Sequence, residues 1–178
     1  EIVTRLIKLI DYATPENNTF TAINQWTVQG AGGDTKRPDI VIFVNGLPLV
    51  VVELKSGSRE EVSTTDAYLQ LRNYMKSIPE LFWYNGFCII SDMTYSMAGT
   101  ISSNESRFME WKTIDGSYEE TAIATYDVLF RGMLEPCRLL NILKHFTLIM
   151  RDTPDDIKIL SAYHQYRSEE RRVGKECR

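Results

Sequence analysis

Residues 37–55 read RPDIVIFVNGLPLVVVELK, and this stretch decides the fold. Two apolar runs, from Pro38 to Val44 and from Pro48 to Lys55, flank Asn45-Gly46, and an Asn-Gly pair in that position is the strongest short signal of a β-hairpin. Apolar side chains occupy both faces of the second run, because consecutive strand residues point to opposite sides. A strand buried on both faces lies inside a sheet that helices cover, so we predict a central strand here.

The flanking segments predict an α/β fold, in which helices flank a central mixed sheet. Thr65 or Asp66 can cap a helix that runs to about Ser77, and Pro79 then stops it. The other elements that we expect are a helix over Ile2–Tyr12, strands over 20–28, 86–92, 95–101 and 108–113, a polar loop over 29–36, and two helices over 122–150 that break near 132–136.

The composition is that of an ordinary globular protein, with 178 residues, 43% hydrophobic residues, 25% charged residues and a net charge of -4. It excludes a disordered chain and a DNA-coating protein with a dominant basic face, but it allows an enzyme that touches DNA at one local site. No apolar run reaches the roughly 18 to 20 residues of a membrane span, and no signal peptide is visible. The 3 scattered cysteines favour a reducing cytoplasm over a disulfide framework.

Both ends of the chain carry a prediction about domain organisation. The first residue is Glu1 and not Met, which predicts a fragment. The final stretch, 167–178, reads RSEERRVGKECR and contains no aromatic residue. We predict an appended, vector-derived tail there, with a native solvated helix end as the alternative. The folded domain is expected over 1–150, followed by a helical lead-in over 151–166.

Three charged residues stand at the ends of the two hairpin strands. Asp39 opens the first strand, and Glu53 and Lys55 close the second, where their two-residue spacing puts them on one face. Charged groups that end a buried strand are costly unless they are paired or bind a metal. Two carboxylates on adjacent strands offer the hard oxygen ligands that Mg²⁺ prefers, and the backbone carbonyl of Leu54 could add a third.

This grouping suits the hydrolysis of a phosphodiester. A divalent ion lowers the pKa of a water molecule and stabilises charge on a phosphoryl oxygen. Lys55 could orient or deprotonate the water and offset the developing negative charge. The simpler alternative is an ordinary salt bridge of Lys55 with Asp39 or Glu53, because the E-x-K spacing at a strand end is common.

The register of the hairpin decides whether Asp39 and Glu53 share a face. A two-residue loop followed by a regular ladder would pair Asp39 with Val52, and Asp39 would then lie on the face opposite to Glu53. We therefore expect a three-residue loop that ends at Gly46 in the left-handed conformation of a G1 bulge, or else a bulge near Pro38.

Pro38-Asp39 followed by Glu53-Leu54-Lys55 resembles the PD-(D/E)xK nuclease motif. The longer run over 37–56 closely resembles the nuclease domain of the restriction (R) subunit of type I restriction–modification enzymes, and the stretches PENNTFTAINQWTV, FCIISDM and ILSAYHQY fit the same family. The resemblance implies a restriction-endonuclease-like core. It also implies that Asp39, Glu53 and the Leu54 carbonyl bind Mg²⁺ and that Lys55 is the catalytic lysine.

Gln70 and Tyr74 lie four residues apart on the expected helix and therefore share one helix face. The pair resembles the Q-x-x-x-Y motif that follows the catalytic lysine in this family and in RecB-like nucleases. The resemblance implies that these residues support the site or contact the DNA backbone, and we expect them to face the sheet end that carries Glu53. The alternative is a tyrosine that packs on the sheet beside an exposed glutamine.

The resemblance implies Mg²⁺-dependent endonucleolytic cleavage of double-stranded DNA in the cytoplasm, by a nuclease domain over 1–150 with a lead-in over 151–166 toward an ATP-driven motor. The implied partners are double-stranded DNA and the specificity and methyltransferase subunits, with no membrane. The chain contains no G-x-x-x-x-G-K-[ST], so we do not expect it to bind ATP in that way. The alternatives are a non-catalytic docking module and another RecB-like nuclease of the same fold.

Overall fold

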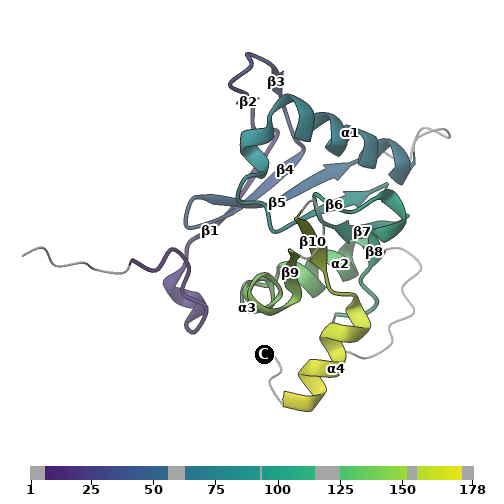
Figure 1. Ribbon diagram of the computed structural model, residues 1–178. Helices are drawn as coiled ribbons and strands as arrows, with labels where there is room; N and C mark the ends of the chain where they lie inside the picture. The colour runs from purple at the N-terminus through teal and green to yellow at the C-terminus, as the bar shows by residue number, and fades with distance from the viewer. Residues whose placement is uncertain (1–6, 56–62, 93, 115–124, 152–155, 174–178) are drawn as a thin grey trace, which may run out of the picture.

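A six-stranded mixed sheet lies at the centre of the protein (Figure 1). The computed structural model describes residues 7–55, 63–92, 94–114, 125–151 and 156–173. In sheet order the strands are β1 (Phe20–Asn24), β4 (Ile40–Val44), β5 (Leu47–Leu54), β6 (Phe87–Ser91), β7 (Ser96–Gly99) and β8 (Met109–Glu110). β5 and β6 run parallel, and all other neighbours in this sheet run antiparallel.

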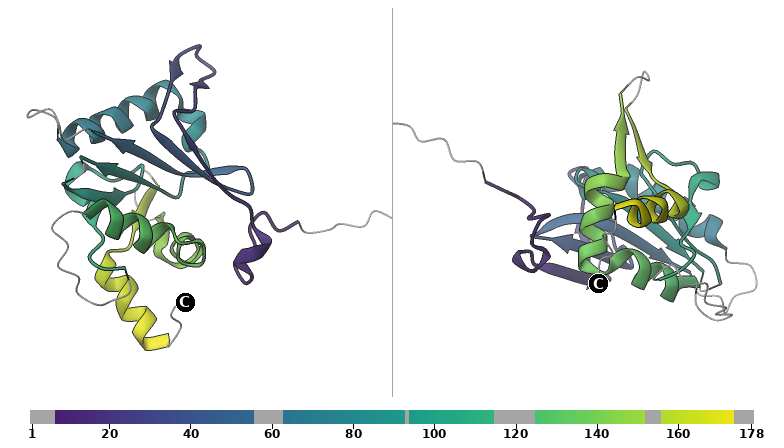
Figure 2. Two further views of the ribbon diagram at one scale, coloured as in Figure 1. Left: turned by 180° about the vertical axis from the view of Figure 1, so that it is seen from behind. Right: turned by 90° about the horizontal axis from the view of Figure 1, so that it is seen from below.

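Helices cover both faces of this sheet, which confirms the expected α/β class (Figures 1 and 2). α1 (Thr64–Ser77) lies on one face, and α2 (Thr125–Leu134) and α3 (Pro136–Asn141) lie on the other. The further elements are the pair β2 (Val28–Gln29) and β3 (Thr35–Lys36), the pair β9 (Thr147–Met150) and β10 (Ile157–Leu160), the terminal helix α4 (Tyr163–Val173), and the short helices η1 (Pro15–Asn17), η2 (Pro79–Phe82), η3 (Glu105–Arg107) and η4 (Ile142–Phe146).

β5 is the central strand that its apolar sequence predicts. Val50, Val51 and Val52 are each 0% exposed. Val51 belongs to the cluster under α1, which includes Leu71, whereas Val50 and Val52 belong to the cluster on the opposite face, which includes Leu129 of α2. Burial of apolar side chains on both faces fixes this strand between two helical layers.

α1 forms where the sequence predicts a helix, but its N-cap differs by a few residues. Ser63 is the N-cap, and its backbone N–H donates to Oδ2 of Asp66 over 2.9 Å in a capping box. The expected caps, Thr65 and Asp66, lie inside the first turn. The helix ends at Ser77, immediately before the Ile78-Pro79 pair, as expected.

Two expected helical segments are wrong where the structure describes them. Residues 7–12 contain no helix, because the Asp11 side chain accepts hydrogen bonds from the amides of Ala13 and Thr14 and so favours a turn. The break between α2 and α3 lies where it was expected, but the helical prediction fails from Thr147 to Met150, which form strand β9. That apolar run pairs with β10, and periodicity alone cannot distinguish such a short run from a helix.

The expected strand over 20–28 and the expected loop over 29–36 also differ from the structure. The strand is interrupted, because β1 ends at Asn24 and β2 begins at Val28. Part of the loop is paired, since β2 and β3 form a short antiparallel ribbon. The interruption falls at Gln25, which directly follows β1 and has a φ of 52° outside the strand region.

The C-terminal segment packs against the folded body. Tyr166 is 0% exposed, and its ring lies 5.1 Å from Trp111 and 4.8 Å from Phe146. Arg167 donates from Nη2 to the Ile114 carbonyl over 2.6 Å. α4 thus runs across the boundary predicted between residues 166 and 167, and the domain limits stay predictions. Among the helices that the structure describes, none combines the length and the apolar character that a membrane span needs.

Candidate active site

The β4–β5 turn is a two-residue turn, so the expected three-residue loop is wrong. Val44 pairs with Leu47 across the turn. Asn45 and Gly46, the two central residues, have φ angles of 51° and 82°. Positive φ at both central positions is the conformation of a type I′ turn, which matches the twist of the two strands.

A β-bulge within the hairpin supplies the register shift that the loop does not. The pairing passes from Phe43–Pro48 to Ile42–Val50, which leaves Leu49 as an extra residue on β5. Leu49 and Val50 both pack into the core cluster on the α2 side, although adjacent strand residues normally point to opposite faces. The expected shift therefore occurs, but neither at the loop nor near Pro38.

The shifted register sets the two carboxylates on one face. The last described pair is Ile40–Val52, so the next position places Asp39 opposite Glu53. Residues directly opposite each other share a face of the sheet. That face is the one under α1, since Val51, two residues before Glu53, packs into the cluster that α1 covers.

Glu53 is a buried carboxylate that has one partnered oxygen. The residue is 3% exposed, and its Oε1 accepts a hydrogen bond from Nζ of Lys55 over 2.7 Å. Its Oε2 is buried and has no partner within hydrogen-bonding distance among the residues that the structure describes, although the Tyr74 hydroxyl lies close enough to help lower the pKa of Glu53. Burial raises the pKa of Glu53, the nearby charge of Asp39 raises it further, and the contact with Lys55 lowers it.

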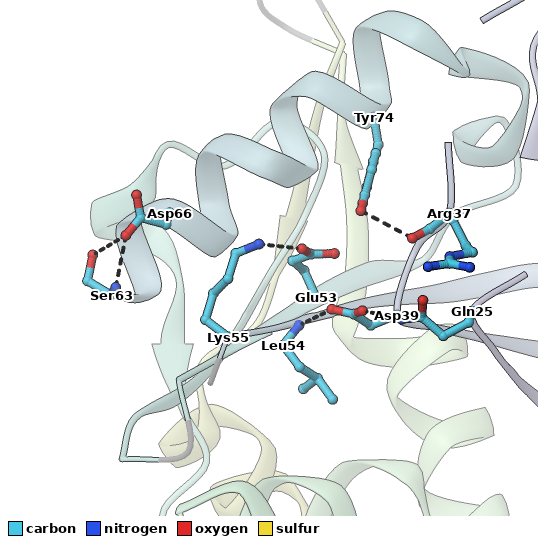
Figure 3. Close-up of polar contacts among 9 residues, drawn as sticks. All are labelled: Gln25, Arg37, Asp39, Glu53, Leu54, Lys55, Ser63, Asp66 and Tyr74. Carbon is cyan, nitrogen blue, oxygen red and sulfur yellow. Dashed lines mark hydrogen bonds and ion pairs between the residues drawn. The ribbon is translucent and has the colours of Figure 1, made fainter. Parts of the chain in front are cut away.

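Asp39 is half-buried, and donors hold both of its carboxylate oxygens (Figure 3). Oδ2 accepts from the backbone N–H of Leu54 over 2.8 Å, and Oδ1 accepts from Nε2 of Gln25 over 2.5 Å. Gln25 lies outside the motifs by which the sequence predicts the site. The β1–β4 register could have identified it, because Asn24 pairs with Ile40 and the next position sets Gln25 opposite Asp39.

Lys55 lies at the end of β5 with its ammonium group against Glu53. Its backbone N–H donates to the Ser91 carbonyl of β6 over 2.7 Å, and its side chain is 24% exposed. The E-x-K spacing alone is not distinctive, since Glu110 and Lys112 form a second such pair over 2.5 Å at the exposed edge strand β8. What distinguishes Lys55 is the buried carboxylate that it contacts.

Tyr74 points from α1 toward the sheet end that carries Glu53 (Figure 3). Tyr74 is 4% exposed, and its hydroxyl donates to the Arg37 carbonyl over 3.4 Å. Burial raises the pKa of Tyr74 to about 12. A hydrogen bond with Gln70 lowers it, whereas the charge of Glu53, a hydrogen bond with Glu53 and the charge of Asp39 raise it. Gln70, half-buried on the same helix, therefore lies beside the Tyr74 hydroxyl.

The site offers oxygen donors from two side chains. Among the described residues, no cluster of three or more histidine, cysteine, aspartate or glutamate side chains could hold a metal ion. Any ion at Asp39 and Glu53 would therefore complete its coordination with backbone carbonyls and water. Such mixed oxygen coordination is typical of Mg²⁺ sites that act on phosphates.

Comparisons with known proteins match this chain to type I restriction enzymes. The family model described as "Type I restriction enzyme R protein N terminus" matches residues 1–107. The HindI endonuclease subunit of Haemophilus influenzae is 38% identical over 90% of this chain. The putative MjaIXP endonuclease subunit of Methanocaldococcus jannaschii is 28% identical over 92% of the chain, and the SauCOLORF180P subunit of Staphylococcus aureus is 29% identical over 84%. The matched regions span only 16%, 17% and 15% of these relatives.

Proposed function

The chain belongs to the family of type I restriction enzyme R protein N termini, and from this premise we propose that it is a nuclease domain that cleaves double-stranded DNA in a Mg²⁺-dependent reaction. One observation carries the proposal: Asp39, Glu53 and Lys55 meet on one face of the sheet, at the edge where β4 begins and β5 ends. Two carboxylates and an ammonium group at one place suit phosphodiester hydrolysis.

A divalent ion fits the donors that the chain presents. Glu53 Oε2 is a buried acceptor without a partner among the described residues, which is costly unless another group meets it. The Asp39 oxygens retain lone pairs, because a carboxylate oxygen can accept more than one contact. The backbone N–H of Leu54 donates to Asp39. A strand residue directs its N–H and its C=O toward the same neighbouring strand, so we expect the Leu54 carbonyl to lie on the side of Asp39 as well.

The roles of the side chains follow from their positions. When bound, the ion would supply Lewis acidity toward a phosphoryl oxygen of the DNA backbone. Lys55 holds its ammonium group 2.7 Å from Glu53, and its partial exposure lets an incoming phosphate or water reach it. There Lys55 would orient the attacking water and offset the negative charge that develops on the phosphate.

Tyr74 and Gln70 are assigned a supporting role. The Tyr74 hydroxyl is neutral near pH 7, because its ordinary pKa of 10.0 already lies well above neutral and burial raises it to about 12, so this group acts as a hydrogen-bond donor. It donates to the carbonyl of Arg37, two residues before Asp39, and this bond fixes the approach to β4. Gln70 is half-buried beside the Tyr74 hydroxyl, and a direct contact with the DNA backbone is its alternative role.

The larger assembly is inferred from the relatives. They are named endonuclease subunits of type I restriction enzymes, and this chain matches about one sixth of their length. We therefore assign the ATP-driven motor to the rest of such a subunit, and we expect the specificity and methyltransferase subunits to contact the whole protein. The reaction is placed in the cytoplasm, in keeping with the free thiols of Cys88 and Cys137.

DNA cleavage by an intact restriction complex that contains this chain tests the proposal. Asp39→Ala and Lys55→Ala should abolish cleavage, while size-exclusion chromatography shows normal assembly. The matched control is Lys112→Ala, which removes the ammonium group of the exposed E-x-K pair and should leave cleavage unchanged. Loss of assembly together with cleavage would favour a docking module, and full cleavage by Asp39→Ala would refute the nuclease site.

The metal site has a separate test in the isolated chain. Calorimetric titration with Mn²⁺, a common substitute for Mg²⁺, should show binding that an Asp39→Ala, Glu53→Ala double variant loses. Binding by the double variant with unchanged affinity would place the ion elsewhere and remove the basis for the proposed chemistry.

A further inference from the structure

We infer that Gln25 is a positioning residue for Asp39, which it holds in the orientation that binds the metal ion; this inference rests on the function proposed above. Gln25 carries no charge and lies outside the PD-(D/E)xK and Q-x-x-x-Y motifs. Its position in the sheet, its two bonds to Asp39 and its backbone conformation together assign this role.

The first observation is a double contact between Gln25 and Asp39. The backbone N–H of Gln25 donates to the Asp39 carbonyl over 2.8 Å, and its side-chain Nε2 donates to Asp39 Oδ1 over 2.5 Å (Figure 3). The Leu54 amide holds the other oxygen, Oδ2. Two donors on opposite oxygens fix the plane of the carboxylate, so its free lone pairs keep one direction.

The second observation is the alignment of three strands. The β1–β4 register continues to Gln25 opposite Asp39, and the shifted β4–β5 register continues to Asp39 opposite Glu53. Asp39 and Glu53 therefore share a face, and Gln25, the residue directly after β1, reaches Asp39 Oδ1 with its side chain from the neighbouring position. Gln25 therefore flanks the two carboxylates on the side away from Lys55.

The third observation is the backbone conformation of Gln25. Its φ is 52°, one of two positive φ values among the described non-glycine residues. A left-handed conformation costs free energy for a residue that carries a Cβ, and proteins keep such residues where the surroundings hold them and often at functional sites. Asn24 and Trp26, on either side, do not share this conformation.

The substitution Gln25→Asn distinguishes an effect on the orientation of Asp39 from an effect on the stability of the fold. Asparagine tolerates a positive φ better than glutamine, and the backbone bond to the Asp39 carbonyl does not depend on the side chain. The shorter side chain cannot reach Asp39 Oδ1. The substitution should therefore leave the melting temperature within about 2 °C of the parent chain while it weakens Mn²⁺ binding about tenfold, the effect expected of a residue that orients a metal ligand. Gln29→Asn, the same change on the exposed strand β2, is the matched control and should change neither quantity.

Two measurements on the 178-residue chain test the inference. Electron paramagnetic resonance counts free Mn²⁺ and gives the affinity of each variant. In metal-free protein, ¹H–¹⁵N spectra report the side-chain amide of Gln25, whose signal is assigned by its loss in Gln25→Asn. Asp39→Asn replaces the accepting carboxylate by an amide and should displace that signal, whereas a Gln25 side chain that does not contact Asp39 in solution would leave it in place.

The outcomes separate this inference from the function on which it rests. Mn²⁺ binding that depends on Asp39 and Glu53, together with weakened binding in Gln25→Asn and a displaced amide signal in Asp39→Asn, would support both. Parent-like affinity in Gln25→Asn, or an amide signal that Asp39→Asn does not move, would overturn the inference alone. Absence of Mn²⁺ binding in the parent chain, or binding that survives loss of both carboxylates, would overturn the proposed metal site and the inference with it.

Discussion

Replacing Glu53 with glutamine should stabilise the metal-free protein near neutral pH, although it should abolish metal binding. Glu53 is 3% exposed, and its Oε2 has no hydrogen-bond partner among the described residues. Glutamine keeps a polar atom at this position but removes the charge, and an unpartnered charged group costs more than a neutral one, which costs about 1–3 kcal/mol. The substitution also removes the ion pair with Lys55, but the Lys55 side chain is 24% exposed and its ammonium group can turn to water, so its loss of a partner costs less than in a fully buried pair.

The net gain should be about 1–2 kcal/mol at pH 7, which corresponds to a rise of about 2–8 °C in melting temperature for a domain of this size. The gain should depend on pH. Burial raises the pKa of Glu53 above its ordinary value of 4.5, so the folded protein binds the proton more tightly than the unfolded chain does. The parent protein is more stable when Glu53 is protonated. This extra stability is complete below the pKa of Glu53 in the unfolded chain, and it is lost as the pH rises through the pKa of Glu53 in the folded protein. The difference between variant and parent should therefore vanish below about pH 4 and reach its full size at neutral pH.

Thermal unfolding with and without Mn²⁺ completes the test. A ligand at ten times its dissociation constant adds about 1.4 kcal/mol to the stability of the form that binds it. The parent chain should gain this stabilisation in Mn²⁺, and Glu53→Gln should not. Glu110→Gln, in the exposed E-x-K pair, should change neither the stability nor the effect of Mn²⁺. A variant that is less stable than the parent at pH 7, or a difference that persists at pH 3.5, would refute the reasoning.

Three further substitutions have defined outcomes. Lys55→Arg should not restore cleavage in the intact complex, because a guanidinium is broader than an ammonium group and stays protonated; near-normal cutting would reduce Lys55 to an ion-pair partner. Gly46→Ala should cost about 1 kcal/mol in denaturant unfolding, since the added Cβ meets open space but the φ is +82°; Gly32→Ala, also in open space and without a positive φ, should cost nothing. Arg138→Met should cost about 2–4 kcal/mol, because the buried guanidinium donates to three backbone carbonyls, and a stability equal to that of the parent would show that these bonds are dispensable.

The sequence predicted the parts of the fold in which local pattern and burial agree. The valines of β5 carry apolar side chains on both faces, and this pattern identified the central strand before any partner was known. α1 was predicted from its boundaries, since Thr65 or Asp66 can cap a helix and Pro79 stops it, and the structure places the cap at Ser63. Asp39, Glu53 and Lys55 were identified because charges at the ends of apolar strands are costly unless they act together, and the structure brings all three to one place.

What only the tertiary structure decided was the pairing of distant segments. Thr147–Met150 became a strand because β10 lies beside it, and nothing within those four residues specifies that partner. The one-residue shift that aligns Asp39 with Glu53 comes from Leu49, which joins Val50 on the α2 side of the core. Gln25 reaches Asp39 only through the register of a third strand. Periodicity along the chain reports the conformation of a segment and the face that it buries, whereas register and bulges depend on packing between segments that the sequence pattern does not contain.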